Sequence, residues 1–130
     1  MARAAEALVG TRFRLHGRDP GWGLDCIGLA AAALEGAGIE THPPTGYALR
    51  NADTRDAVAL AQRSGLVAAQ GAELPGDIVL VRAGPAQVHL LVISSTSGFI
   101  HAHAGLRRVV ACPGAPAWPV LHRWRAIGKV

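Results

Sequence analysis

Residues 23–36 have the sequence Gly-Leu-Asp-Cys-Ile-Gly-Leu-Ala-Ala-Ala-Ala-Leu-Glu-Gly. Asp25 is a favoured N-cap residue, and the pattern therefore predicts a helix from Cys26 to about Glu35, closed by the glycines that follow. This helix is apolar on nearly every side, which is typical of a helix buried at the centre of a domain. The sequence thus predicts a cysteine at the N-terminus of a central buried helix.

The other segments predict helices first and strands afterwards. Helices are predicted for the Ala-rich residues 2–9 and for a segment that opens at residues 53–56, and a turn-rich loop of residues 17–23 precedes the central helix. Strands are predicted for residues 78–81, 88–93, 99–103, 107–110 and 120–125. This order indicates an α+β fold, with helices packed on one side of an antiparallel sheet of about five strands.

The composition is that of one folded domain. The chain of 130 residues is near the commonest domain size, so we expect residues 1–130 to form a single unit. Half of the residues are apolar, 17% are charged and the mean hydropathy is +0.24, which excludes a disordered chain. No run approaches the roughly 20 apolar residues that cross a bilayer, and Glu6 lies where the apolar region of a signal peptide would begin. We therefore expect a protein made in the cytoplasm without a signal peptide and without a membrane partner.

The basic charge of the chain does not by itself indicate a nucleic-acid partner. Thirteen basic and nine acidic residues give a net charge of +4, and the pI is about 10.0. The basic residues are scattered, whereas nucleic-acid-binding proteins usually cluster them on one face beside aromatic side chains. We therefore expect no nucleic-acid partner. A weak attraction to an anionic polymer such as a cell wall fits the charge equally well.

Cys26 is a candidate nucleophile because of its place in the sequence. The chain has two cysteines, Cys26 and Cys112, and neither belongs to a Cys-x-x-Cys pair, so no disulfide framework is indicated. Free N–H groups and the dipole at a helix N-terminus favour an anion, and we therefore expect a lowered pKa for the Cys26 thiol. A cysteine in a buried helix is otherwise usually a core residue, and Cys112 is interpreted as such a passive thiol.

Two histidines on neighbouring predicted strands can supply the base that a cysteine nucleophile needs. Residue 95 is midway between His89 and His101, so a hairpin centred there would place the two imidazoles directly opposite each other. His103 points to the same face of its strand but would lie on the diagonal, farther from His89. We therefore expect His101, and not His103, to orient the ring of His89.

Four blocks of the chain have, in order and spacing, the motifs of one enzyme family. They are residues 23–29 (Gly-Leu-Asp-Cys-Ile-Gly-Leu), 74–78 (Leu-Pro-Gly-Asp-Ile), 88–92 (Val-His-Leu-Leu-Val) and 99–102 (Phe-Ile-His-Ala). These resemble the nucleophile block, the Pro-Gly-Asp turn, the strand of the catalytic histidine and the strand of the third polar residue of the NlpC-type cell-wall cysteine peptidases. The resemblance extends over about residues 8–125.

The resemblance implies a papain-like domain with a defined set of site residues. Cys26 would be the nucleophile, His89 its general base and then general acid, and His101 the residue that orients His89. The backbone N–H of Cys26 would contribute to the oxyanion site. Asp25, beside the nucleophile, is a further candidate of the site. Trp22 could line the substrate cleft, although an aromatic residue that anchors its loop is an equally good interpretation.

Three positions depart from the pattern of the family. Ile27 replaces a serine, which changes packing rather than chemistry. Phe13 replaces a tyrosine whose hydroxyl helps at the oxyanion site, and His16 replaces a nearby glycine and could supply a donor instead. No metal and no cofactor are expected for this mechanism.

The resemblance also implies a substrate and a setting. The substrate would be the peptide stem of peptidoglycan, cut between the γ-carboxyl of D-glutamate and a diamino acid. The short form of the chain resembles peptidases encoded with phage tails and gene transfer agents, which implies tail proteins as partners and action on the wall as part of a particle. Two alternatives stay open: a zinc site formed by His89, His101 and His103, and a non-catalytic tail protein that keeps the fold.

Overall fold

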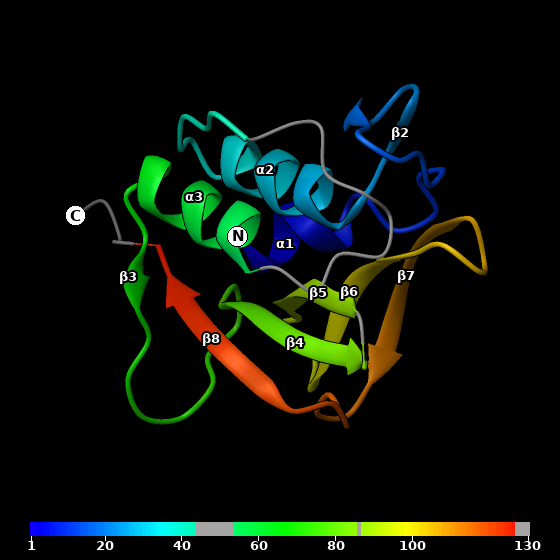
Figure 1. Ribbon diagram of the computed structural model, residues 1–130. Coiled ribbons are helices and arrows are strands. Elements are labelled where there is room, and N and C mark those ends of the chain that lie inside the picture. Colours follow the sequence, from blue (N-terminus) through cyan, green and yellow to red (C-terminus); the bar gives the residue numbers. More distant parts are fainter. Residues whose placement is uncertain (44–53, 86, 127–130) are drawn as a thin grey trace.

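The computed structural model describes residues 1–43, 54–85 and 87–126. The helices α1 (Ala2–Glu6), α2 (Cys26–Gly36) and α3 (Arg55–Arg63) lie on one side of a curved sheet (Figure 1). This arrangement confirms the predicted α+β fold class. Among the described residues, no helix combines the length and the apolar character needed to cross a membrane.

The main sheet has six strands in the described part of the chain, one more than the sequence predicted. In spatial order they are β3 (Val67–Ala68), β8 (Val120–Arg125), β4 (Ile78–Gly84), β5 (Gln87–Ile93), β6 (Gly98–His103) and β7 (Arg108–Pro113), each antiparallel to its neighbours. The additional strand is β3, whose two residues are too few to show the alternation on which strand prediction depends. Likewise, the predicted loop of residues 17–23 contains the two-residue strand β1 (Arg18–Asp19), which pairs with β2 (Gly23–Leu24).

The N-terminal helix is shorter than predicted. The backbone N–H groups of Leu8 and Val9 donate to carbonyls three residues back, so the chain tightens into turns after Glu6. Gly10 follows with a φ of 93°, the left-handed conformation that glycine commonly provides after a helix. Of the segment predicted to open the third helix, Asp53 lies outside the described residues and α3 begins at Arg55.

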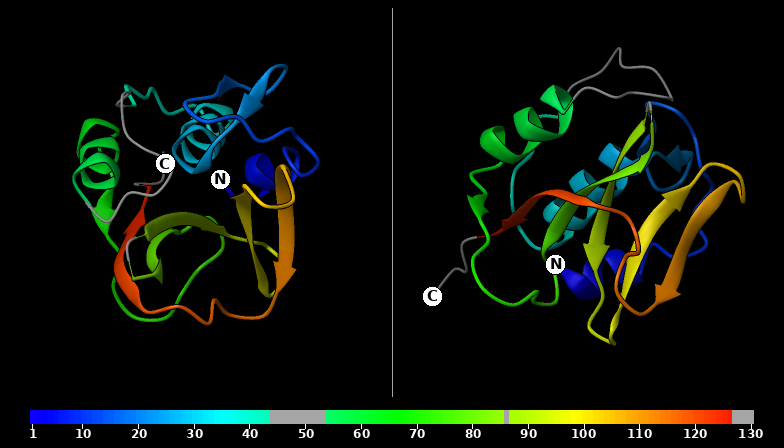
Figure 2. Two further views of the ribbon diagram at one scale, coloured as in Figure 1. Left: turned by 45° about the vertical axis from the view of Figure 1, so that its right-hand side comes forward. Right: turned by 60° about the horizontal axis from the view of Figure 1, so that its bottom comes forward.

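Helix α2 is the central buried helix that the sequence predicted. The side chain of Asp25 accepts a hydrogen bond from the backbone N–H of Gly28 at 2.8 Å and caps the helix. The helix lies between α1 and α3 (Figure 2) and packs against the inner face of the sheet, through side chains such as Leu80, Leu90 and Ile100. Burial of each such side chain contributes roughly 1.5–3 kcal/mol relative to exposure. This packing fixes the N-terminus of α2, and with it Cys26, against β5.

The outer face of the sheet is also apolar, which the sequence analysis did not predict. Val79, Leu91 and Phe99 belong to a second buried cluster, against which the half-buried Trp118 packs from the segment before β8. Because β4 to β6 are covered on both faces, their central residues are apolar without alternation. His101, which contacts Phe99 and Trp118 on this face, is therefore shielded from solvent.

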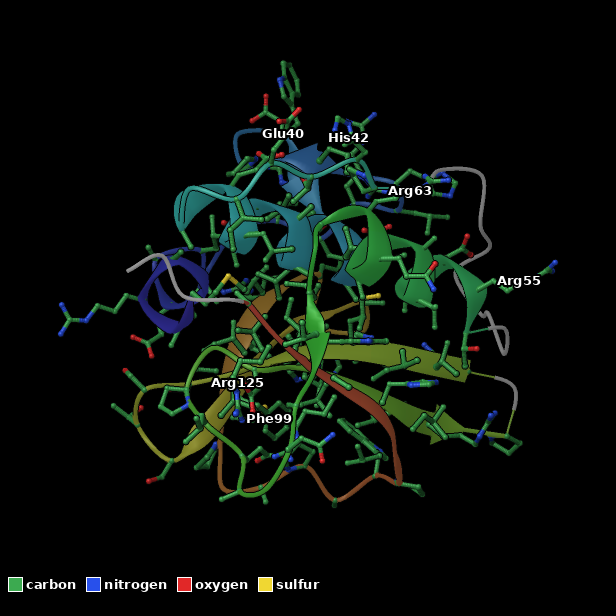
Figure 3. All side chains as sticks on the ribbon, turned by 90° about the vertical axis from the view of Figure 1, so that its left-hand side faces the viewer. Glu40, His42, Arg55, Arg63, Phe99 and Arg125 are labelled. Carbon is green, nitrogen blue, oxygen red and sulfur yellow. The ribbon has the colours of Figure 1, made fainter. Side chains whose placement is uncertain are left out.

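The Pro-Gly-Asp turn before β4 has a structural role. Asp77 is fully buried, and its carboxylate accepts hydrogen bonds from Arg125 Nε at 2.7 Å and Nη2 at 2.9 Å and from the backbone N–H of Leu74 at 3.0 Å. Burial alone would raise the pKa of Asp77, but these hydrogen bonds and the charges of Arg125 and Arg123 hold it below its usual value. The ion pair joins β8 to the start of β4 on the sheet side of the molecule, where Figure 3 shows Arg125 and Phe99.

The register of the β5–β6 hairpin differs from the prediction. The paired residues are Val92 with Ile100 and Ile93 with Phe99, so the hairpin is centred on residue 96 rather than 95. Five residues separate Ile93 from its partner Phe99, two more than a centre at 95 allows, and within this turn Ser94 N–H donates to the carbonyl of Gly98 and Ser97 adopts a φ of 52°. Continued along the two strands, this register places residue 89 against residue 103 and makes His101 the diagonal neighbour of His89. The prediction that His101 is the direct partner and His103 the diagonal one is therefore wrong.

Candidate active site

Cys26 lies at the start of α2, in a loop arrangement that Asp25 organises. Asp25 is 3% exposed, and besides capping the helix it accepts hydrogen bonds from the backbone N–H of His16 at 2.8 Å and from Arg18 Nη1 at 3.0 Å. Gly28 is required here, because a Cβ at this position would collide with the carbonyl oxygen of Gly17. Asp25 thus holds the loop before α2 in a fixed position relative to the cysteine.

A cavity of about 280 Å³ joins Cys26 to the histidines of β5 and β6. Cys26, His89, His101 and His103 all line it. Further lining residues come from the N-terminal loops, α3, β5 and the loop before β8: Phe13, Leu15, Asp25, Asp56, Gln87 and Trp118. The structure therefore brings together the three residues that the sequence analysis placed in the catalytic centre.

The imidazoles of His89 and His101 are hydrogen-bonded. Nε2 of His89 lies 3.0 Å from Nδ1 of His101, and the ring centroids are 5.2 Å apart. The predicted contact is thus present in spite of the shifted register, since diagonal neighbours on a sheet are within reach of aromatic side chains. His89 uses Nε2 for this contact, and its other ring nitrogen, Nδ1, takes no part in it.

His103 is placed differently from His101. Its Nδ1 accepts a hydrogen bond from the backbone N–H of Leu106 at 3.0 Å, and its ring centroid is 5.4 Å from that of His101. It therefore lies beside the pair of His89 and His101 as a neighbour. Within the described ranges, no group of three His, Cys, Asp or Glu side chains is arranged to hold a metal ion.

Burial keeps the catalytic candidates uncharged. The pKa of the Cys26 thiol is raised to about 11, mainly by burial and further by the charge of Asp25. Hydrogen bonds from backbone amides such as that of Leu90 lower the pKa, but they offset only part of this increase. Burial, together with the charges of His101 and His103, lowers the pKa of His89 to about 3, and burial and His103 lower that of His101 to about 4. The expected lowering of the Cys26 pKa is therefore wrong, because the helix N-terminus is outweighed by burial and by Asp25.

These pKa shifts predict the reactivity of Cys26 as a function of pH. We expect the rate of alkylation by iodoacetamide to rise about tenfold per pH unit from about pH 6 to about pH 9, because only the thiolate reacts and its fraction grows tenfold per unit below the pKa. Peptide mapping by mass spectrometry separates Cys26 from Cys112 in the same sample. A rate that levels off between about pH 6 and about pH 8 would instead indicate a thiolate–imidazolium pair and contradict the neutral resting state.

The remaining candidates of the sequence analysis divide into two groups. Phe13 lines the cavity, where it offers no hydroxyl group. His16 and Trp22 are not among the described residues that line it. Trp22 is 70% exposed and borders a separate hollow with Arg12 and Arg14.

Two residues of the site were missed. Trp118 lines the cavity, and its ring centroid is 6.1 Å from that of His101. Cys112, interpreted from the sequence as a passive thiol, places its sulfur 3.4 Å from Nε2 of His101. Neither had a usable signal in the sequence, because Trp118 belongs to a Pro-rich irregular segment and Cys112 lies beyond the predicted end of its strand.

His101 is the most enclosed histidine of the site. It is 4% exposed, with Phe99 and Trp118 at centroid distances of 5.3 Å and 6.1 Å. By contrast, His42 is exposed and pairs with Glu40 at 3.2 Å on the helical side, far from Phe99 (Figure 3). The site histidines therefore differ from an ordinary surface histidine in burial and in their partners.

Comparison with known proteins identifies the fold. No family model and no curated protein sequence matches the chain. Among solved structures, NlpC2 of Trichomonas vaginalis has a TM-score of 0.68 at 22% identity, over 95% of this chain and 46% of that one. An NlpC/P60 family protein of Bacillus cereus has a TM-score of 0.65 at 19% identity, over 96% and 40%. The NlpC/p60 domain of the peptidoglycan hydrolase SagA has a TM-score of 0.54 at 21% identity, over 85% and 84%.

The first two matches cover nearly the whole of this chain, which spans only 46% and 40% of the length of those two structures. Together with the buried helix α2 and the antiparallel sheet, they confirm the fold class that the sequence predicted. The chain has the papain-like α+β fold of the NlpC/P60 proteins.

Proposed function

We propose that the protein is a cysteine peptidase that hydrolyses the peptide stems of bacterial peptidoglycan. The observation that carries the proposal is the shared cavity of Cys26 and His89, with Nε2 of His89 3.0 Å from Nδ1 of His101. A nucleophile, a base and a group that orients the base are the parts that acyl transfer by a cysteine requires. The likeness to the NlpC/p60 domain of a peptidoglycan hydrolase supports the choice of substrate.

The neutral resting state determines the first step. As the sulfur of Cys26 attacks the scissile carbonyl, its proton passes to Nδ1 of His89, and the C–S bond forms while the carbonyl oxygen becomes an oxyanion. The backbone N–H of Cys26 is among the first-turn amides of α2 that have no acceptor within the helix, and it can donate to this oxyanion. Nε2–H of the His89 imidazolium donates to Nδ1 of His101.

The later steps return the proton. His89 gives the proton from Nδ1 to the leaving amine, the C–N bond breaks and a thioester remains on Cys26. Water, deprotonated by the now neutral His89, then attacks the thioester and releases the new carboxylate and the free thiol. No donor from Phe13 takes part, so the oxyanion is stabilised by backbone amides.

The proposal extends to the bond and the setting. The resemblance of the sequence blocks supports cleavage between the γ-carboxyl of D-glutamate and a diamino acid. The resemblance to peptidases of phage tails and gene transfer agents supports the further proposal that the protein reaches the wall with a tail-like particle, after synthesis in the cytoplasm. Co-purification of the protein with such particles is the test of this second part.

The test of the activity is digestion of purified peptidoglycan by the wild type and by Cys26→Ala. Walls with diaminopimelate and walls with lysine at the third stem position are compared, and the released peptides are identified by mass. We expect fragments cut after D-glutamate with the wild type and none with Cys26→Ala. Release that survives in Cys26→Ala and is stopped by a chelator would indicate the zinc alternative. If the wild type and Cys26→Ala are both folded and neither releases peptides, the result would indicate the alternative of a non-catalytic tail protein that keeps the fold.

A further inference from the structure

Cys112 has no role in the mechanism proposed above, yet its sulfur contacts the third residue of that mechanism. Sγ of Cys112 lies 3.4 Å from Nε2 of His101. Cys112 on β7 is paired with Phe99 on β6, so it is the diagonal neighbour of His101 on the outer face of the sheet. Both ring nitrogens of His101 thus have a partner, one on each side: His89 and Cys112.

The direction of these two hydrogen bonds decides whether His89 can be a base. A neutral imidazole has one donor and one acceptor nitrogen. If Cys112 donates its S–H to His101, then His101 donates from Nδ1 to Nε2 of His89, and the proton of His89 occupies Nδ1. That nitrogen then has no lone pair for the proton of Cys26. Only the opposite direction leaves His89 able to act.

The charged state of His89 permits one direction only. Both nitrogens of an imidazolium are donors, so once His89 has taken the proton of Cys26, Nδ1 of His101 must accept. Nε2 of His101 then carries the hydrogen and points at Cys112. A thiol sulfur can accept a hydrogen bond through its lone pairs, although weakly. The sulfur of Cys112 can therefore accept the hydrogen bond from the Nε2–H of His101, which must be present once His89 is charged. His101 is enclosed, so water is largely excluded as an alternative acceptor.

We propose that Cys112 is a positioning residue whose sulfur accepts the Nε2–H of His101 and so holds the histidine pair in the direction in which His89 takes the proton of the nucleophile. This inference rests on the proposed function. It assigns to Cys112 an effect on the turnover rate rather than on substrate binding, because the hydrogen bond is needed most when His89 is charged. Val110, directly opposite His101 on the same strand, has no lone pair and provides the matched comparison.

The first test is spectroscopic and does not require activity. In the uniformly ¹⁵N-labelled protein, long-range ¹⁵N–¹H correlations of the imidazoles show which nitrogen of His101 is protonated. We expect hydrogen on Nε2 in the wild type and a mixture of both forms in Cys112→Val, which keeps an apolar side chain but no acceptor. Hydrogen on Nδ1 in the wild type, or a spectrum that Cys112→Val leaves unchanged, would overturn the inference even if the protein cleaves peptidoglycan.

The second test is kinetic. A net contribution of about 0.5–1.5 kcal/mol for one hydrogen bond corresponds to a fall of about 2- to 13-fold in the kcat of Cys112→Val, with KM unchanged. Cys112→Ser retains lone pairs at this position and is expected to recover part of the rate and the Nε2–H form, and it replaces Cys112→Val if that variant does not fold. Val110→Ala is expected to keep kcat within about twofold, because it removes packing but no acceptor. An equal fall in Val110→Ala would mean that packing alone is responsible.

Discussion

Replacement of His89 by alanine is expected to lower kcat/KM for a stem peptide by about 10³- to 10⁴-fold at neutral pH. A general base contributes about 10²- to 10⁴-fold to such reactions, and the high pKa of the nucleophile places this enzyme near the upper end. With a thiol pKa of about 11, only about one Cys26 in 10⁴ is a thiolate at pH 7, since each unit is a factor of ten. Without His89, the reaction would depend on that small fraction.

The dependence on pH distinguishes loss of the base from general damage. The wild type should have constant activity over neutral pH, because its base has a pKa of about 3 and its thiol one of about 11. In His89→Ala, activity should rise about tenfold per pH unit above neutrality, as hydroxide forms the thiolate that His89 no longer helps to form. Rates are measured on a synthetic stem peptide from about pH 5 to about pH 10, with thermal unfolding as the check of the fold.

His42→Ala is the matched control, because it removes an exposed histidine on the helical side of the molecule. It should leave both the rate and the pH profile unchanged. A His89→Ala protein that is folded and within about tenfold of the wild type, with a flat pH profile, would remove His89 from the mechanism.

The local features of the fold could be predicted because short segments determine them. Asp25 caps the backbone N–H of Gly28, three residues later, and this local contact marks the start of α2 independently of the surrounding packing. The apolar composition of α2 indicates that the helix is buried. The positions of β4, β5, β6 and β8 follow in the same way from apolar runs between turn residues. These are statements about neighbouring residues, for which the sequence is sufficient.

The register of the site shows what the sequence could not determine. A polar turn between Ile93 and Phe99 permits a centre at residue 95 or at residue 96, since serine and glycine fit either turn. The predicted contact between His89 and His101 is nevertheless present. The change of centre moves the partner of each β5 residue by two positions along β6, which keeps the side chains of His89 and His101 on the same face of the sheet. A shift by a single residue would have sent them to opposite faces.

The pKa of Cys26 depends on groups that only the tertiary structure assembles. The sequence indicates the helix N-terminus, which favours a thiolate, but not the burial against β5 that opposes it. The same reason explains why Trp118 and Cys112 were missed. Trp118 reaches His101 across the outer face of the sheet from an irregular segment, and Cys112 reaches it from a neighbouring strand whose register the sequence does not determine.

The removal of His101 is expected to cost far more activity than the removal of His103. Nδ1 of His101 is 3.0 Å from Nε2 of His89, whereas Nδ1 of His103 is occupied by the backbone N–H of Leu106. In His101→Ala, the Nε2–H of the charged His89 would have no acceptor in an enclosed site. A buried hydrogen bond to a charged group is worth about 1.5–3 kcal/mol, which corresponds to a fall of about 10- to 150-fold in kcat.

The two histidines should also differ in how they respond to substitution and to pH. His101→Asn and His101→Gln should retain part of the activity, because an amide oxygen can accept from His89 without titrating. His103→Ala should lower kcat less than about fivefold, as it removes no hydrogen bond of His89. Because the charge of His103 lowers the pKa of both other histidines, its removal should move the acid limit of activity to higher pH.

Steady-state kinetics across acidic pH, with folding checked for each variant, measures all of these outcomes. If His103→Ala lost more activity than His101→Ala, His103 would be the residue that orients His89. If His101→Ala and His103→Ala lost activity equally and added zinc restored it, the result would indicate a metal site, because all three imidazoles would then act together.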